Sequence, residues 1–299
     1  MNHVKRISGI LVFTACLFYL WKTIGSVKID IRAVIADANA PSVVLSVCLM
    51  FFSYLTEAYS WKTTVGFLGR DIRMKDAVSV FYLANLYNYL PLKGVSLMSR
   101  ILLCGKYGIG KGTAVTSLFY ETCFTLVASL AVTMVVVGYR YGGSLLPGIL
   151  VFSSGALLLF FTGYQFIRKA AGWYGRITGR HLHLDKKTDL TTYSVLISPY
   201  VVSRVLSGAA FSLLMYAFSS PPAVYFPFLA AVPCAVWMLS LAGIVIPRGI
   251  GVREAAYVYI LSIYFPAAAV LTPVVVLRLM TLLMDVLFGA YGKVRYSAR

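Results

Sequence analysis

Charged residues inside long apolar segments are the part of this sequence most able to do chemistry. Six bases and four acids stand in such places: Lys93, Arg100, Arg204, Arg248, Arg253, Arg278, Glu57, Glu121, Glu254 and Asp285. An ionised group at the centre of a bilayer costs about 2.5–3.5 kcal/mol or more, so such groups are usually paired, inward-facing and functional. Six bases against four acids leave two positive charges, which a phosphate-bearing ligand would satisfy.

The spacing of these residues predicts specific pairs. Arg278 and Asp285 lie about two helical turns apart, so one helix face presents both. We expect Arg278 to pair with Asp285 or with an acid on a neighbouring helix, and Glu254 to have a basic partner. The alternative is that all these charges are ion pairs that only tie helices together.

Two breaks rich in proline and glycine interrupt the apolar sequence. Their tips consist of Pro91, Lys93 and Gly94 in the first break and of Pro247, Arg248, Gly249 and Gly251 in the second. The pieces beside them are too short to cross a hydrocarbon core of about 30 Å as helices. Non-helical backbone at that depth must be buried in protein or line a water-filled cavity. We therefore expect re-entrant hairpins at 77–104 and 222–265, with tips that approach near the midplane; ordinary loops are the alternative.

The composition indicates that the chain is surrounded by lipid rather than by water. Of 299 residues, 60% are apolar and 12% are charged, whereas soluble domains carry about 25% charged residues. We expect an all-α integral membrane bundle, a single polytopic transmembrane domain over residues 1–299. The six full spans are expected at residues 7–24, 41–68, 113–137, 144–167, 193–218 and 267–291.

The net charge is +17, and the basic residues lie mostly in short loops between apolar segments. This distribution is typical of cytoplasmic loops rather than of nucleic-acid binding. With the N-terminus inside, 16 basic residues fall on inner segments and four on outer segments (Lys22, Lys28, Arg32 and Arg140). The segment 168–190 becomes a basic cytoplasmic loop. The bias predicts a cell-membrane protein with both termini cytoplasmic, because positive charge is retained on that side.

Each half of this topology ends with a hairpin followed by a full span, at residues 77–137 and 222–291. The two halves point in opposite directions. Paired interrupted segments in corresponding positions are typical of inverted repeats with a binding site at the midplane.

Metal, cofactor and soluble catalytic sites are not indicated. The five cysteines are scattered through apolar segments, and His181 and His183 have no third ligand beside them. No Gly-Lys-Ser/Thr phosphate loop and no Ser/His/Asp set stands out. We expect a protein that is not an enzyme and that uses no cofactor and no metal.

The two broken segments resemble a known family. Leu90-Pro91-x-Lys93-Gly94, and Ile246-Pro247-Arg248-Gly249-Ile250-Gly251 with Glu254 after it, are similar to motifs of the transmembrane region of lysylphosphatidylglycerol synthase/flippase proteins and their stand-alone relatives. The family pattern is Leu-Pro…Gly-Glu early and Ile-Pro-Gly-Gly-Leu-Gly-x-x-Glu late. Arg248 replaces a usual glycine, and Val95-Ser96 stand where an acid usually follows.

The resemblance, over about residues 1–292, implies movement of a phospholipid or polyprenyl-phosphate lipid between leaflets. Two-part members of the family carry a soluble aminoacyl-transferase domain after the membrane region, and the resemblance does not imply lysyl transfer by this chain. We expect Lys93, Arg100, Arg248, Arg253 and Arg278 to hold the headgroup, with Glu121, Glu254 and Asp285 neutralising them or carrying a proton. The alternative is a non-transporting subunit of a glycosyltransferase or lipid-modifying enzyme. Membrane lipids are the expected partners. A homo-oligomer and a membrane enzyme partner are further alternatives.

Overall fold

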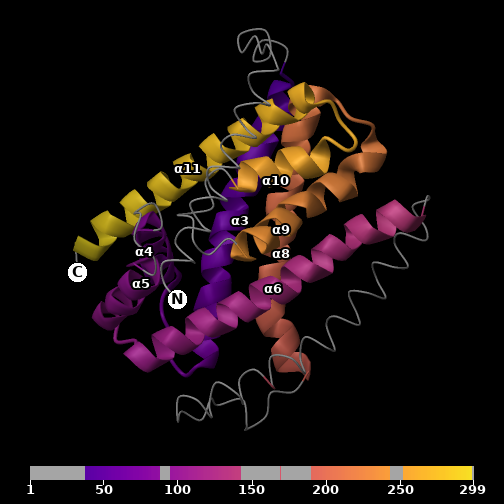
Figure 1. Cartoon of the computed structure of the whole chain (residues 1–299). Coiled ribbons are helices and arrows are strands. Elements are labelled where there is room, and N and C mark those ends of the chain that lie inside the picture. The colour runs from indigo at the N-terminus through magenta and orange to yellow at the C-terminus, as the bar shows by residue number, and fades with distance from the viewer. Residues whose placement is uncertain (1–37, 88–94, 143–168, 170–189, 243–251, 298–299) are drawn as a thin grey trace, which may run out of the picture.

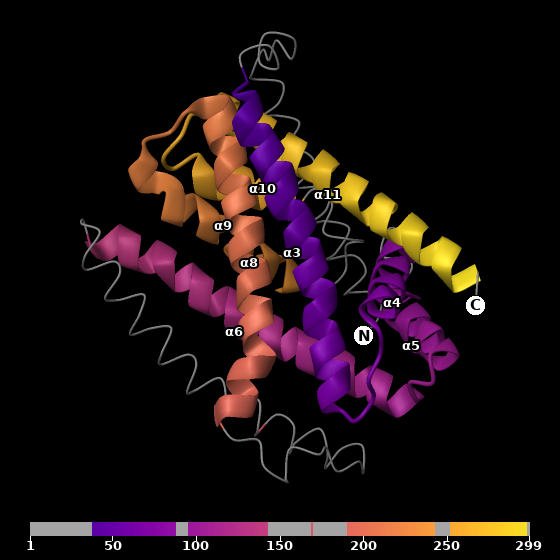
Figure 2. The same cartoon turned by 180° about the vertical axis from the view of Figure 1, so that it is seen from behind.

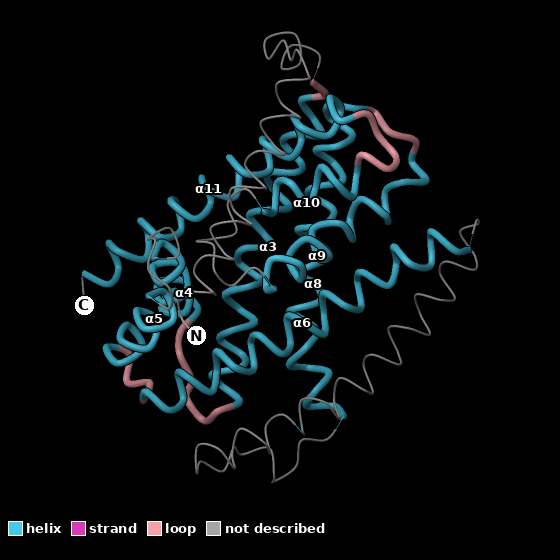
Figure 3. Tube along the Cα trace, viewed as in Figure 1, coloured by secondary structure: helices cyan, strands magenta, loops and turns pink. Residues whose placement is uncertain are grey.

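Helices form all the regular structure in residues 38–87, 95–142, 169, 190–242 and 252–297, the part of the chain that this computed structural model describes (Figures 1 and 3). They are α3 (Ala40–Phe67), α4 (Met74–Leu86), α5 (Val95–Lys106), α6 (Lys111–Gly142), α8 (Leu190–Ser219), a 3-10 turn η3 (Ala223–Tyr225), α9 (Phe226–Ala242), α10 (Val252–Leu261) and α11 (Ala267–Ser297). The predicted all-α class is confirmed for these residues.

Five described helical segments are long and apolar enough to cross a membrane, so the chain is a multi-pass membrane protein. They are Ala40–Phe67, Lys111–Met134, Thr191–Ser219, Ala223–Ser240 and Ala269–Ser297. Four of them coincide with predicted spans, and the fifth, η3 with α9, lies in the region predicted as the first limb of the second hairpin. The predicted spans 7–24 and 144–167, both hairpin tips and nearly all of the loop 168–190 lie outside the described residues.

The helix lengths repeat along the chain. A 28-residue α3 is followed by short α4 and α5, of 13 and 12 residues, and by a 32-residue α6. Then come a 30-residue α8, α9 and α10 of 17 and 10 residues, and a 31-residue α11. The packing repeats too: α3 lies along α8 (Figure 2), α4 packs on α11, and α9 packs on α6.

Small polar residues bring α3 and α8 together. Ser53 Oγ donates to the Ser203 carbonyl at 3.0 Å, and Ser203 Oγ donates to the Ser53 carbonyl at 3.3 Å. Ser46 Oγ donates to the Ala210 carbonyl at 2.7 Å. Small side chains let helix backbones approach in a bilayer, and these hydroxyls satisfy their own polarity across the interface. The reciprocal pair marks the point at which the two antiparallel helices cross.

Glycines allow close contact of α11 with α4 and of α8 with α9. A Cβ at Gly292 of α11 would lie 2.9 Å from the Ser79 carbonyl oxygen of α4, and one at Gly208 of α8 would overlap the Ala230 carbonyl of α9. A stack of Tyr54, Tyr82 and Phe288 fills the junction of α3, α4 and α11, with ring centroids 4.9–5.7 Å apart. These contacts fix the helices that surround the charged residues.

The ends of the helices follow local chemistry. Asn39 caps α3, its side chain accepting from the Ser42 N–H at 3.1 Å, and Pro41 occupies the first turn. Gly69, with φ of 81°, follows the end of α3 and turns the chain. Prolines lie inside α8, α9 and α11. The Ala269 carbonyl that Pro273 leaves free accepts from Ser219 Oγ of α8 at 2.6 Å, and the Val195 carbonyl that Pro199 leaves free accepts from Ser198 Oγ at 3.3 Å.

Candidate functional site

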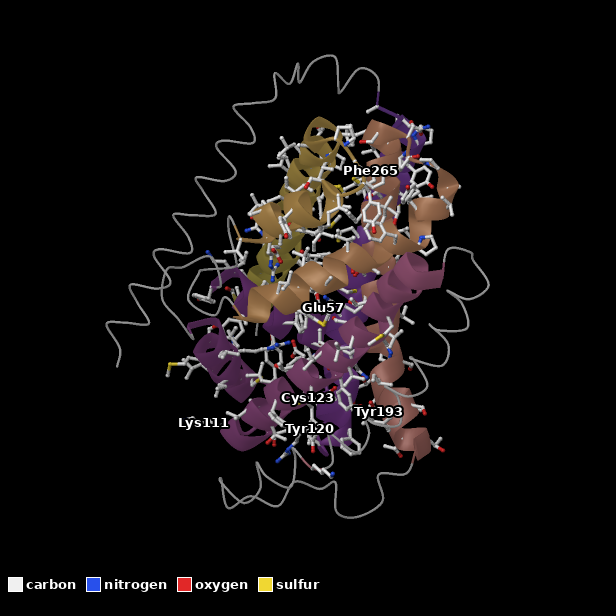
Figure 4. All side chains as sticks on the ribbon, turned by 45° about the vertical axis from the view of Figure 1, so that its right-hand side comes forward. Glu57, Lys111, Tyr120, Cys123, Tyr193 and Phe265 are labelled. Carbon is white, nitrogen blue, oxygen red and sulfur yellow. The ribbon has the colours of Figure 1, made fainter. Side chains whose placement is uncertain are left out.

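A cavity of about 370 Å³ lies among the helices at the centre of the bundle. Side chains from α3, α4, α6, α8, α9, α10 and α11 line it. Its charged lining residues are Glu57, Glu121, Arg204, Arg253, Glu254, Arg278 and Asp285. In Figure 4, Glu57 lies between Phe265 towards one end of the bundle and Lys111 towards the other. Seven of the ten ionisable groups predicted at membrane depth therefore share one polar space.

Arg278 and Glu254 join α11 to α10 in the cavity wall. Arg278 Nε lies 3.3 Å from Glu254 Oε1, and the two side chains are 24% and 18% exposed. This confirms that Arg278 pairs with an acid on a neighbouring helix and that Glu254 has a basic partner. Asp285, which was expected on the same face of α11, also lines the cavity and is fully buried.

Arg204 and Glu57 form a second pair, which joins α8 to α3. Arg204 Nη2 donates to Glu57 Oε1 at 2.8 Å, and both residues line the cavity. The Arg204 guanidinium carbon lies 5.8 Å from the centroid of the Trp237 ring on α9. Glu57 lies one turn after Ser53 on α3, and Arg204 directly follows Ser203 on α8, so the close approach of the two helices sets the geometry of the pair.

Arg100 is held differently from the other arginines. Arg100 Nη1 donates to Glu121 Oε2 at 2.8 Å, and its side chain is only 7% exposed. The guanidinium carbon lies 3.9 Å from the Phe81 ring centroid and 4.7 Å from that of Trp61. Glu121 lines the cavity, whereas Arg100 stands behind it. The arrangement positions the Glu121 carboxylate from within the protein.

Arg253 supplies a third guanidinium to the cavity. Its Nη2 donates to Ser240 Oγ at 3.2 Å, which links the start of α10 to the end of α9. Of the five residues predicted to hold a headgroup, the structure brings Arg253 and Arg278 to the cavity and places Arg100 behind its wall. Lys93 and Arg248 lie outside the described residues, as do Pro91, Gly94, Pro247, Gly249 and Gly251.

The described lining is of mixed sign, with three arginines and four carboxylates. The described lining therefore carries no excess of positive charge. Guanidinium groups in such surroundings can hold phosphate through paired N–H bonds, and carboxylates can neutralise them when no ligand is bound.

Arg204 and Glu57 are lining residues that sequence reasoning did not place in the site. Both were recognised as charges within apolar segments, which was the available signal. Neither lies near a Pro/Gly break, so nothing in the local sequence connected them to the hairpin tips. Only the packing of α3 on α8 brings them into the cavity.

A family model described as the lysylphosphatidylglycerol synthase TM region matches residues 6–289 of the chain. No curated protein matches it. The matched residues include every charged residue of the cavity lining.

Proposed function

Because the chain belongs to the lysylphosphatidylglycerol synthase transmembrane-region family, whose membrane domain indicates a lipid-related function, we propose that it moves an anionic lipid between leaflets. The supporting observation is the cavity at the centre of the bundle, where Arg204, Arg253 and Arg278 converge from three helices. A phosphate headgroup needs such donors to leave water. The acyl or prenyl chains would remain in the bilayer while the headgroup passes through the cavity.

The proposal treats the chain as a transporter rather than an enzyme, with an anionic phospholipid or a polyprenyl-phosphate lipid as its substrate. Lys93 and Arg248 would meet the headgroup at the hairpin tips and pass it to the arginines of the cavity. Glu121, Glu254 and Asp285 would balance the bases in the empty state or carry a proton. The cycle would be passive or coupled to an ion gradient.

We also propose an inverted repeat, in which α3–α6 correspond to α8–α11. The repeated order of helix lengths and the matched packing of α4 on α11 and of α9 on α6 support it. The reciprocal Ser53–Ser203 bonds would lie at the pseudo-two-fold axis. In each half the two short helices would form the re-entrant hairpin, so the two broken segments would enter from opposite sides of the membrane.

The proposed orientation has both termini in the cytoplasm of a cell-membrane protein. The end of the bundle near α4 and α5 carries Arg70, Arg73, Lys75, Lys106, Lys111, Lys293 and Arg295. At the opposite end, the described chain near Asn39, Ser220 and Phe265 has no Lys or Arg apart from Arg140 in the last turn of α6. The asymmetry follows the positive-inside rule.

The direct test is leaflet scrambling of fluorescently labelled anionic phospholipid in vesicles that contain only this protein. We expect wild-type protein to move the lipid, and Arg253→Ala to move it at least about tenfold more slowly, because a charge-assisted phosphate contact worth 1.4 kcal/mol or more is lost. Arg70→Ala, an exposed change outside the cavity, is the matched control. If wild-type protein moved no phosphate-bearing lipid in vesicles, with or without an ion gradient, the result would favour the accessory-subunit role.

A further inference from the structure

The arginines in the cavity wall and behind it differ in how a ligand could reach them. Arg100 is enclosed by Phe81, Trp61 and Glu121, and it does not line the cavity. In the pairs Arg204–Glu57 and Arg278–Glu254, by contrast, both partners line the cavity. A ligand that enters the cavity therefore meets two guanidinium groups that a glutamate of the protein already occupies.

We propose that Glu57 and Glu254 are exchangeable counter-anions, which leave Arg204 and Arg278 when the phosphate of a lipid headgroup takes their place. Glu121 is instead a permanent partner of Arg100. The inference rests on the proposed function and deepens it, because it states how the empty site is kept neutral and which chemical group can open it.

The energetics of buried ion pairs restrict what can replace the carboxylates. Removing one partner of a buried pair is strongly destabilising, since the other charge is left without compensation. A neutral headgroup cannot displace Glu254 from Arg278, because it offers no compensating charge. A phosphate can, because its oxygens accept the same charge-assisted hydrogen bonds and match the planar guanidinium. The pairs thus select for an anionic headgroup.

The released glutamates have polar surroundings to enter. Ser53, Ser207 and Thr281 line the same cavity, and the space of about 370 Å³ admits water. The Glu254 side chain is on the first turn of α10, where the positive end of the helix dipole favours a carboxylate. Glu254 can therefore leave Arg278 while its charge remains stabilised.

Exchange also explains why a site for an anion contains so many carboxylates. Without them, Arg204 and Arg278 would hold phosphate so firmly that the headgroup would be released slowly. Glu57 and Glu254 compete for the same donors, so they weaken binding and return the site to its neutral state. Transport needs this balance, because a site must release its substrate as well as bind it.

The test uses the purified full chain in phosphatidylcholine nanodiscs, with sn-glycerol 3-phosphate as a soluble headgroup probe and calorimetry as the readout. We expect Glu254→Gln and Glu57→Gln to bind the probe about tenfold more tightly than wild type, because a competing anion is removed. Glu121→Gln should show no tightening, and neither should Asp71→Asn, a carboxylate-to-amide control at an exposed position. Arg278→Gln and Arg204→Gln should weaken binding.

Thermal unfolding supplies a second readout. The probe should raise the Tm of Glu254→Gln more than that of wild type, because phosphate supplies the counter-charge that the variant lacks. Where the glutamine variant fails to fold, Glu254→Asp, which keeps the charge on a shorter side chain, should bind the probe moderately more tightly than wild type.

Three outcomes would overturn the inference. The first is glutamine variants that bind the probe no more tightly than wild type, which would make the glutamates structural partners. The second is equal tightening in Glu121→Gln, which would show a general effect of charge. The third is no binding of the probe to wild type. If the protein still moved anionic lipid in vesicles in any of these cases, the inference of counter-anion exchange would be wrong, but the proposed lipid transport would not.

Discussion

At the scale of single residues, access to the cavity separates the two roles that an arginine can have inside a membrane. Arg100 lies against Phe81 and Trp61 and bonds to Glu121, so its guanidinium is desolvated and fixed. Arg278 and Arg204 face the cavity through pairs that solvent or ligand can reach. A fixed arginine contributes stability, whereas an accessible one contributes binding.

Arg100→Lys should therefore destabilise the protein although it keeps the charge. A lysine ammonium cannot stack on Phe81 and Trp61 as a planar guanidinium does, and it reaches Glu121 as a point charge. We expect a loss of about 2 kcal/mol, measured as a lower Tm in detergent. Arg70→Lys, at an exposed position, should leave the Tm unchanged. An unchanged Tm in Arg100→Lys would mean that the aromatic enclosure contributes nothing.

Swapping the two charges of the Arg278–Glu254 pair should restore the stability that a single charge reversal removes. Arg278→Glu alone places two like charges together in the cavity wall and should sharply reduce stability. The double variant Arg278→Glu with Glu254→Arg restores opposite charges across α10 and α11. A double-mutant cycle on unfolding should give a coupling energy of about 0.5–3 kcal/mol. Additive effects of the two changes would argue against a direct pair.

At the scale of elements, small residues decide how closely the helices pack and hence where the charges meet. Ser53 and Ser203 lie at the crossing of α3 with α8, and Gly208 and Gly292 lie where long helices meet short ones. Apolar helices gain little by burying one another in lipid, so close backbone contact and hydrogen bonds hold the bundle together.

Gly208→Ala tests this close contact between α8 and α9. The added Cβ would overlap the Ala230 carbonyl, so the helices must separate, at a cost of about 1–3 kcal/mol. Gly66→Ala is the matched control, because its Cβ would meet nothing within 4 Å, and it should be neutral or slightly stabilising. Thermal unfolding distinguishes the two, and equal Tm values would contradict the tight contact.

Asp76 fastens the end of α11 to the start of α4. Its two carboxylate oxygens accept from Arg295 Nε at 3.1 Å and Arg73 Nε at 3.0 Å, and its side chain is only 4% exposed. We expect Asp76→Asn to cost about 1–3 kcal/mol and to release the end of α11, which limited trypsin digestion would detect at Arg295.

Asp71→Asn is the control for that change. Asp71 also pairs with a basic residue, Lys62 at 3.5 Å, but its side chain is 89% exposed. Exposed pairs contribute little to stability. Trypsin digestion should therefore match wild type, and a faster cut in this variant would mean that any lost charge at this end loosens the chain.

At the scale of the whole molecule, the orientation in the membrane can be read by chemical labelling. In a cysteine-free background, Ser262→Cys should react with a membrane-impermeant maleimide in intact cells, because it is exposed at the end of the bundle where the described chain carries few basic residues. Asp71→Cys, at the basic end, should react only after permeabilisation. The opposite pattern would invert the proposed topology.

The sequence by itself determined the class of protein, the apolar helices and the set of buried charges. Hydrophobic length and composition are local properties, so the spans that became α3, α6, α8 and α11 could be predicted with nearly their observed bounds. The family also followed from short local motifs and was confirmed by the match over residues 6–289. The predicted pairing of Arg278 with an acid on another helix held because a buried charge requires a partner.

Only the tertiary structure decided which charges meet. The docking of α10 against α11 places Glu254 beside Arg278, two residues that lie far apart along the helical sequence. Arg204 and Glu57 are distant in sequence, and the crossing of α3 with α8 brings them together. Arg100 was expected in the binding site, and the structure encloses it between Phe81 and Trp61. The physical reason is that helix formation depends on neighbours in sequence, whereas ion pairs between helices depend on packing, which no single segment specifies.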